Sequence, residues 1–419
     1  MTDVLHHVLK AGWIAGLLFC ATAVLAEDSW VLTGSDFRRS NAAVESLDPQ
    51  GVRIVTADGA KSLRPLDEVL RLERASMIPL TKPKLILFLQ QGDRLAGDAA
   101  TLKDEILIWT NASIGELKLP LSKLRGISRL DPPSGLDSDR REDQVVLSNH
   151  DVVRGVVAGI EDGKILVQTG GDTVPVPFAS ADSIFFATTP RPSTAMSVSW
   201  RLQFADTSVL TASAIAIKDG KLSFQLPGGN KVADSKTTFT ANLSTLQSVE
   251  QLNGPVSWLS DRPATSDKQT PFNSETVYPA RMNLNVFGKP LRVGAQSFEK
   301  GIGVHANSVL SFPLDGTYKV FRTRYAIDTN SDASKAVVSV RILLDGRVVH
   351  EEKNFRAFKL SPVVTVELSS AKELTLEVIA EGPTDTQDRL DWIESALIRT
   401  AVKSTATAPS PAGGASDKR

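Results

Sequence analysis

The sequence predicts an all-β protein, in which an N-terminal array of small barrel-like β repeats is followed by a C-terminal jelly-roll β-sandwich. Three observations support this class. Short runs of alternating apolar and polar residues, the pattern of half-buried strands, recur along most of the 419 residues. Gly, Pro, Asn and Asp separate these runs, as turn residues do. From Trp30 to about Glu250 the runs recur every fifty residues or so, which indicates a repeat architecture.

The N-terminus has the features of a secretory signal peptide, which we assign to residues 1–26. Lys10 precedes an apolar run from Ala11 to Leu25, and Ala26 closes a cleavage site with small residues at −3 and −1. The run is short for a membrane span, and an uncleaved anchor is the alternative. Cleavage would remove Cys20, the single cysteine. Export without disulfides suits a bacterial periplasm, so we expect a periplasmic or secreted protein.

The repeats are expected to contain four or five short strands each. Asp162-Gly163 and Asp219-Gly220 lie between alternating runs and predict two-residue hairpin turns. A leucine-rich segment closes a repeat and fits either a one-turn helix or a final strand. These units resemble small Sm-like or SH3-like barrels, and one continuous β-sheet array is the alternative. We place the repeats at residues 27–75, 84–131, 143–188 and 197–250.

Composition changes mark the other boundaries. Pro132 to Gly135, with the charged residues after it, and Pro190 to Pro192 are expected to be linkers. Residues 251–283 are rich in Pro, Ser and Thr and also look like a linker. Val256–Leu259 nevertheless resembles a first strand, so we place the C-terminal domain at 254–400. The small, polar tail 401–419 cannot bury a core and is expected to be disordered.

The C-terminal domain is organised around the stretch FEKGIGVHANSVLSF, residues 298–312. Its glycines, Gly301 and Gly303, are expected to let the chain turn sharply into an alternating strand. The order of segments here resembles the NPCBM/NEW2 family, carbohydrate-binding modules with a galactose-binding-like β-sandwich. The resemblance covers roughly the last third of the chain. The matching residues are Pro290-Leu291, Phe298 to Ser308, Tyr318, Phe321, Ile327-Asp328, Asp345-Gly346, Glu373-Leu374 and Asp391-Trp392.

The resemblance implies a non-catalytic protein whose partner is a glycan or polysaccharide. Sugar hydroxyls would be bound from the turn before strand 304–312 and from the loops 328–335 and 382–389. His305 has two interpretations, a hydrogen-bonding ligand residue or a structural cap of its turn. The alternative function is a periplasmic structural or scaffolding protein whose sandwich contacts envelope proteins. The candidate ligand-binding residues are Glu299, His305, Asn307, Arg324 and Asp328.

No cofactor is expected, and a structural calcium ion stays open. Asp328, Asn330 and Asp332 offer hard oxygen ligands at alternating positions, which suits calcium. Ala333 occupies the position where an EF-hand loop has glycine, so that motif is excluded. A solvated turn with Asx hydrogen bonds is the favoured interpretation.

Several other functions lack support in the sequence. Gly301 to Ala306 formally matches a dinucleotide fingerprint, but an alternating strand follows where that motif needs a helix. The net charge of −1 gives no footprint for nucleic acid. No GxSxG, HExxH or P-loop motif is present, so we do not expect an enzyme.

Alternation over 389–398 puts Trp392, Glu394 and Ile398 on one face, with Trp392 in the core rather than exposed as a sugar platform.

Overall fold

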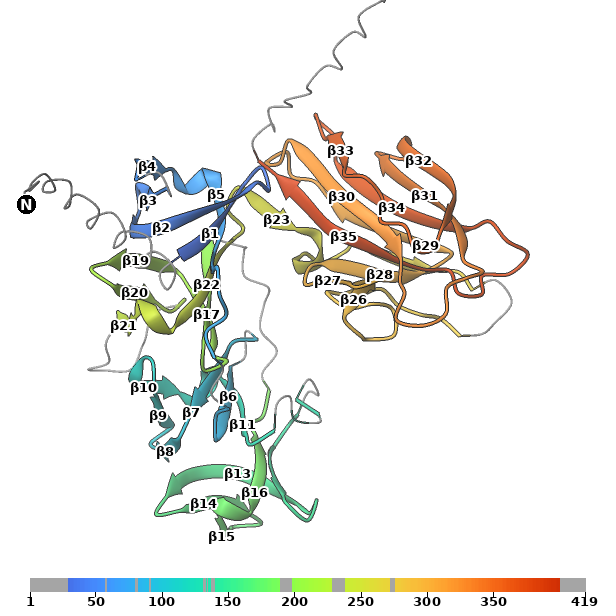
Figure 1. Cartoon of the computed structure of the whole chain (residues 1–419). Helices are drawn as coiled ribbons and strands as arrows, with labels where there is room; N and C mark the ends of the chain where they lie inside the picture. Colours follow the sequence, from blue (N-terminus) through green and yellow to red (C-terminus); the bar gives the residue numbers. More distant parts are fainter. Residues whose placement is uncertain are drawn as a thin grey trace, which may run out of the picture. The chain divides into compact units, whose positions relative to one another are not determined.

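The computed structural model describes residues 29–56, 59–79, 82–89, 92–130, 133, 135–136, 140–188, 198–227, 238–271 and 276–399. The chain divides into two compact units, residues 1–254 and 255–419. The described residues form strands joined by turns and short 3-10 helices, which confirms the predicted all-β class (Figure 1). The expected signal peptide, the tail 401–419 and Pro190 to Pro192 lie outside the described residues. Within them, no helix has the length and apolarity needed to cross a membrane.

The N-terminal unit repeats one arrangement of strands, with a single-turn 3-10 helix before each closing strand. Repeat 1 comprises β1 (Ser29–Gly34), β2 (Arg39–Asp48), β3 (Gly51–Val55), β4 (Lys61–Arg64), η1 (Leu66–Glu68) and β5 (Val69–Arg74). Repeat 2 comprises β6 (Leu85–Leu89), β7 (Arg94–Gly97), β8 (Ala99–Lys103), β9 (Ile106–Asn111), β10 (Gly115–Pro120), η2 (Leu121–Lys123) and β11 (Leu124–Ser128). Repeat 3 comprises β12 (Asp143–Leu147), β13 (Val152–Glu161), β14 (Lys164–Thr169), β15 (Asp172–Pro177), η3 (Phe178–Ser180) and β16 (Ala181–Phe185). Repeat 4 comprises β17 (Ser199–Phe204), β18 (Val209–Ala212), β19 (Ala214–Lys218), β20 (Lys221–Gln225), β21 (Phe239–Asn242), η4 (Leu243–Thr245) and β22 (Leu246–Leu252).

The local turn predictions are confirmed. Asp162-Gly163 joins β13 to β14 and Asp219-Gly220 joins β19 to β20, each as a two-residue loop. All four residues have positive φ, between 48° and 71°, as a turn matched to the right-handed twist of a hairpin requires. The closing segments contain both elements that the sequence left open, since each 3-10 helix leads directly into a strand.

The repeats join into one sheet network rather than closing into separate barrels. Within the described strands, the strand before the 3-10 helix of each repeat (β4, β10, β15 and β21) pairs only with the strand that precedes it. The closing strand pairs instead with the closing strand of another repeat: β5 with β22, and β11 with β16. Repeats 4 and 2 meet through β18 and β7, so the order in space is 1-4-2-3. The continuous array named as the alternative is therefore the arrangement that forms, because each closing strand finds its second partner outside its own repeat.

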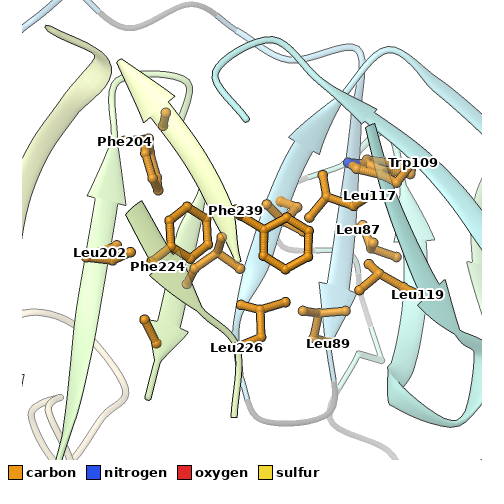
Figure 2. Close-up of a cluster of buried hydrophobic side chains, with 14 of the residues drawn as sticks. Leu87, Leu89, Trp109, Leu117, Leu119, Leu202, Phe204, Phe224, Leu226 and Phe239 are labelled. Carbon is orange, nitrogen blue, oxygen red and sulfur yellow. The ribbon is translucent and has the colours of Figure 1, made fainter. Parts of the chain in front are cut away.

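A single apolar core runs through all four repeats. Figure 2 shows the part of this core where repeats 4 and 2 meet. Phe224 and Phe239 of repeat 4 stack with ring centroids 5.6 Å apart, and Phe239 is directed toward Leu87 and Leu117 of repeat 2 (Figure 2). The unit thus has the buried apolar surface that a chain without disulfides needs.

The C-terminal unit is a sandwich of two antiparallel sheets. The first sheet has the order β25 (Arg281–Met282), β28 (Gly301–His305), β35 (Arg389–Ile398), β30 (Val320–Ile327) and β33 (Val364–Glu367), with β23 (Val256–Trp258) also on β35. The second has the order β24 (Ser266–Gln269), β29 (Ser308–Pro313), β34 (Glu373–Ala380), β31 (Val337–Leu344) and β32 (Arg347–Arg356). A hairpin and one 3-10 helix complete the unit: β26 (Leu291–Val293), β27 (Gln296–Phe298) and η5 (Leu259–Asp261).

The apolar faces of the two sheets enclose the core of the sandwich. Trp392 and Tyr325 from the first sheet and Phe312 from the second have no exposed surface, which confirms the predicted core position of Trp392. The predicted alternation of β35 is wrong beyond Glu394, where φ is 49° and the pairing with β30 shifts. This β-bulge reverses the faces, and Leu397 rather than Ile398 joins the core.

Two expectations for this unit are corrected. Most of 251–283 belongs to the sandwich rather than to a linker, because β23, β24 and β25 pair with β35, β29 and β28. Gly301 and Gly303 lie inside strand β28 and do not have positive φ. They are required because a Cβ at Gly303 would lie 2.5 Å from the backbone of Asn285, and one at Gly301 2.6 Å from the carbonyl oxygen of Trp392.

Candidate functional site

A shallow hollow, about 200 Å³ including the open solvent at its mouth, lies at the end of the sandwich where β24 and β28 stop and β29 begins. Three short segments line it, residues 269–271, 276–278 and 305–307, together with Asp385 from the loop between β34 and β35. Loops gather at the ends of a sandwich, and that is where a rigid scaffold can present binding side chains. The hollow is therefore the candidate functional site.

His305 is held in a fixed orientation at the base of this hollow. Its ring lies nearly parallel to that of Tyr278, with centroids 5.1 Å apart and an interplanar angle of 25°. Its Nδ1 lies 2.7 Å from the carbonyl oxygen of Ala306. Because a carbonyl only accepts, Nδ1 carries the proton, and Nε2 of the neutral ring is an acceptor. The carboxylate of Asp385 lies 4.0 Å from Nδ1.

The other polar side chains of the hollow offer both donors and acceptors. The Oδ1 of Asn307 accepts the Ala380 amide at 2.8 Å, so its Nδ2 group carries the two donors of this side chain. The Oε1 of Gln269 is buried and has no hydrogen-bond partner among the described residues. Asp385 adds the single carboxylate among the described residues that line the hollow. Such a mixture suits a polyhydroxylated ligand, whose hydroxyls both donate and accept.

An exposed aromatic ring stands beside the hollow. Phe287 is 44% exposed and packs edge-on against Tyr278, with centroids 5.6 Å apart. The guanidinium of Arg389 lies 5.5 Å from the centre of the same ring, and Arg389 itself is almost fully buried. Phe287 therefore presents a supported apolar surface next to the polar groups.

The loop after β30 reaches the same end of the sandwich. The carboxylate of Asp332 accepts a hydrogen bond from Gln387 at 2.8 Å, and the amide of Lys335 donates to Gln387 at 2.8 Å. Residues 328–335 and 382–389 are thus joined, next to the β28 end that carries His305. These are the loops expected from the sequence.

The structure separates the five predicted site residues. His305 and Asn307 line the hollow together. Glu299 is exposed at the opposite end of β28, so roughly 13 Å of strand separates the two ends. Arg324 donates to the carbonyl of Ser361 at 3.1 Å and does not line the hollow. Asp328 is fully buried and is closed off from it.

Asp328 belongs to a buried polar cluster behind the first sheet. Its carboxylate accepts hydrogen bonds from the side-chain amides of Asn285, at 3.0 Å, and Asn330, at 2.9 Å. Asp391, 1% exposed, lies beside it. Burial, and next the neighbouring Asp328 carboxylate, raise the pKa of Asp391 well above its ordinary value. Both effects favour the protonated form of Asp391 beside the Asp328 carboxylate.

This cluster does not fit the calcium ion that the sequence left open. Asn285 and Asn330 turn N–H donors, not oxygens, toward Asp328. The carboxylate of Asp332 is occupied by the Ser334 amide and by Gln387. Among the residues that the structure describes, no three His, Cys, Asp or Glu side chains converge on a metal position.

A second buried carboxyl group lies beneath the hollow. Asp388 is 1% exposed, accepts the Val337 amide at 2.9 Å through Oδ1, and uses its carbonyl to bind the Ala306 amide at 2.9 Å. Burial, with a smaller contribution from the neighbouring carboxylate of Asp385, raises the pKa of Asp388 to about 6, although the hydrogen bond from the Val337 amide lowers it. Asp388 thus ties the β28–β29 turn to the loop that carries Asp385.

Sequence reasoning missed three residues of the hollow. Tyr278 and Gln269 lie in the segment interpreted as a linker, which hid their role. The loop of Asp385 was named, but nothing singled out this carboxylate among several. The signal that could have identified Tyr278 is its rarity, since the chain has three tyrosines.

Fold and site together define an antiparallel β-sandwich with a shallow polar hollow at its loop end. Residues 256–398 match the family model of the NPCBM/NEW2 domain, which confirms the resemblance drawn from the sequence. No curated protein matches the chain.

Similar solved structures include a CBM51 module from Clostridium perfringens GH95 in complex with methyl-galactose. The two chains are 21% identical, with 34% of this chain and 99% of that one covered and a TM-score of 0.30. The tandem CBM51 modules of a Streptococcus pneumoniae family 98 glycoside hydrolase are 25% identical, with 36% and 49% covered and a TM-score of 0.31. The CBM51-2 and INT domains of Clostridium perfringens ZmpB, in complex with GlcNAc, are 21% identical, with 45% and 38% covered and a TM-score of 0.31. The chain thus spans less than half of the second and third structures.

Proposed function

We propose that this chain is an exported, non-catalytic carbohydrate-binding protein that holds a glycan or polysaccharide in the hollow around His305. The observation that carries the proposal is the position of the hollow. It includes His305, Ala306 and Asn307, which belong to the GVHANS stretch that resembles the NPCBM/NEW2 pattern, and it exposes both donors and acceptors. A family resemblance alone would not select this end of the sandwich.

The ligand would be recognised through its hydroxyl groups and one apolar ring face. The Nε2 of His305 accepts from a hydroxyl, the Nδ2 of Asn307 donates to one, and Asp385 accepts from one or two. Phe287, beside the hollow, covers the C–H face of a sugar ring. Protein groups around the hollow are already fixed by hydrogen bonds, so binding requires little reordering.

The absence of catalysis is part of the proposal. Hydrolysis of a glycosidic bond ordinarily uses two carboxyl groups on either side of the scissile bond. The described lining of the hollow contains one, Asp385. Asp388 and Asp391 are buried in structural contacts and cannot serve as the second.

Export is proposed from residues 1–26 alone. Mass spectrometry of the native protein should find Glu27 as its first residue, and intact residues 1–20 would contradict this. The N-terminal repeats would then hold the sugar-binding domain within the periplasm or at the cell surface.

A glycan array probed with the chain from residue 27 onward tests the function. Methyl-galactose and GlcNAc, the sugars named with two of the similar structures, are the first compounds to titrate. Saturable binding that is weakened in His305→Ala supports the proposal. If the wild-type chain binds no glycan on a broad array, the proposal fails, and a scaffolding role with envelope proteins as partners becomes the better explanation.

A further inference from the structure

The four repeats share one turn, which aligns them residue by residue. In each repeat the amide of the last residue of the first strand donates to the carbonyl four residues on, at 2.8–2.9 Å. The residue before that carbonyl always has positive φ, between 64° and 81°. Equivalent positions can therefore be compared without ambiguity. Directly after the turn come Arg39, Arg94, Val152 and Val209 in repeats 1 to 4.

Repeats 2 and 4 contact each other through this turn with local two-fold symmetry. The residues directly after the turn, Arg94 and Val209, are paired with each other. On one side of this pair, the carboxylate of Asp93 accepts hydrogen bonds from the amide and the hydroxyl of Thr211, both at 2.8 Å. On the other side, the equivalent Ser208 accepts the amide of Ala96 at 2.9 Å. Equivalent residues thus face each other, as in a symmetric dimer.

Apolar residues flank this contact at another pair of equivalent positions. Leu117 and Phe239 each lie three residues before the residue that caps the 3-10 helix, Pro120 and Asn242. They are 0% and 5% exposed, and Figure 2 shows Phe239 directed across the contact toward Leu117. We call this combined surface, the turn and its apolar flank, the hairpin face of a repeat.

The hairpin face of repeat 3 has an apolar residue at each of these two positions, and both residues are exposed. Val152, equivalent to Val209, is 42% exposed. Val174 lies three residues before the cap residue Pro177, so it is equivalent to Leu117 and Phe239, yet it is 38% exposed. Repeat 3 lies at one end of the 1-4-2-3 order, and among the described strands no further repeat pairs with it there.

We propose that the hairpin face of repeat 3 binds the same face of a second copy of this chain, forming a two-fold symmetric dimer. The contact would reproduce between molecules the one that repeats 2 and 4 make within the chain. Val152 would then lie opposite Val152 of the second copy, and the two Val174 side chains would flank the contact.

Charge supports this choice of partner. Asp151 is equivalent to Asp93, and Arg154 is equivalent to Thr211, the residue that Asp93 binds. In the dimer each Asp151 therefore lies opposite Arg154 of the other copy, which gives two complementary pairs. The present partner of Arg154, Glu142 at 3.6 Å, is exposed and holds it weakly.

Repeat 1, at the other end of the order, is a poor alternative. It has Arg39 in place of Val152 and Arg38 in place of Asp151, so two copies of this face would bring like charges together. At the position of Val174 it has Ser62. Pairing repeat 3 with repeat 1 would set Arg38 against Arg154.

Sedimentation velocity of the chain from residue 27 onward, over a series of concentrations, tests the dimer. The wild-type chain should show a monomer–dimer equilibrium, and Val152→Asp should raise its dissociation constant by about tenfold or more, because two carboxylates would meet at the centre. Val156→Asp is the matched control, since Val156 is 58% exposed on the same strand and its equivalents Asp98 and Ser213 stay exposed in the repeat 2–4 contact.

A charge exchange keeps the test independent of folding. Asp151→Arg and Arg154→Asp should each weaken the dimer, and the double variant should restore it, because the two pairs are regenerated with reversed sign. A wild-type chain that stays monomeric, equal effects of Val152→Asp and Val156→Asp, or a double variant no better than the singles would each overturn the proposal. So would loss of the dimer in Arg39→Asp without loss in Val152→Asp, which would move the contact to repeat 1.

Discussion

The rings of Tyr278 and His305 lie nearly parallel, 5.1 Å apart between centroids, although the two residues come from separate strand connections. Tyr278 precedes β25, and His305 ends β28, the strand on which β25 pairs. The stack and the Nδ1 contact with Ala306 together fix the imidazole, so its Nε2 is presented in one direction. The role of His305 as a ligand residue and its role as a structural cap are therefore compatible.

His305→Ala is expected to weaken glycan binding by about 1–2 kcal/mol, the loss of one hydrogen bond with its partner left unpaired. Tyr278→Ala should weaken binding by a smaller amount, because it removes the orientation of the imidazole but not its nitrogen. Isothermal titration with the glycan found on the array measures both effects.

Glu299→Ala is the matched control for this pair. Glu299 lies at the far end of β28 and should leave the affinity unchanged if the hollow is the site. A loss of affinity in Glu299→Ala equal to that in His305→Ala would instead place the ligand at the other end. A His305→Ala protein that is unfolded in a thermal melt would show that capping dominates.

Gly303→Ala is expected to destabilise the sandwich by about 2–3 kcal/mol. Its Cβ would lie 2.5 Å from the backbone of Asn285, and backbone cannot move aside as a flexible side chain can. Gly382→Ala is the comparison, since its nearest neighbour, the Thr384 carbonyl oxygen, would lie 3.3 Å away and would need to shift by only a few tenths of an ångström, so its effect should be smaller, about 1 kcal/mol or less. Chemical denaturation of both variants measures the difference; equal effects would show that the loop over Gly303 gives way.

The fold class was predictable because it depends on local signals. Alternation, the Asp-Gly turns and the fifty-residue period each act over a few residues or one repeat. The 1-4-2-3 order was not predictable, since it depends on which closing strands pair, and the pairs Leu72–Val249 and Ile127–Ile184 join sequences with no distinguishing pattern. The bulge at Glu394 was hidden for a similar reason, because no residue pattern in β35 marks the position at which the pairing shifts.

The candidate site was predictable only in part. His305 and Asn307 follow from the family motif, because that motif forms one wall of the hollow. Tyr278 reaches the hollow from a Pro-rich segment whose composition indicates a linker. Asp328 was a reasonable ligand candidate by residue type, yet it is buried among Asn285, Asn330 and Asp391, and burial depends on the tertiary structure.

Asp391→Asn is expected to be tolerated at pH 7, with a change in the free energy of unfolding within about 1 kcal/mol. Burial raises the pKa of its carboxyl group and so favours the protonated form, and an uncharged amide of the same shape could donate to Asp328 in its place. Asp391→Ala should cost about 2–4 kcal/mol, since it leaves the buried Asp328 carboxylate without this donor. If the asparagine variant is as unstable as the alanine variant, Asp391 is charged in the folded protein.

Asp388 should make stability fall as pH rises. Burial raises its pKa to about 6 in the folded protein, above the ordinary value of 3.8. Its contribution is therefore fully present below about pH 4 and is lost as pH passes through about 6. The side chain of Asp388→Asn cannot ionise and can still accept a hydrogen bond from the Val337 amide. The free energy of unfolding of this variant should therefore exceed that of the wild type by a margin that grows across this range to about 1–2 kcal/mol. This margin is set below the full pKa difference because solvent near the hollow screens the charge.

Denaturation of both proteins from pH 4 to 8 measures this difference. Asp315→Asn supplies a control of opposite sign. The amide of Thr317 lowers the pKa of Asp315, so that its contribution is present at neutral pH and is lost as pH falls. An Asp388→Asn curve parallel to that of the wild type would show that water reaches this carboxyl group.

The order of the repeats predicts how fragments of the N-terminal unit behave. Residues 84–188 contain repeats 2 and 3, whose closing strands pair through Ile127 and Ile184, so this fragment should melt cooperatively. Residues 27–131 have the same length and contain repeats 1 and 2, which do not share a closing-strand pair. This fragment exposes Leu72 and Ile127 on unpaired edges and should be unstable or aggregate. Circular dichroism during heating compares the two fragments. Equally cooperative melting would mean that each repeat is a self-contained barrel, and that the pairing of closing strands adds little to its stability.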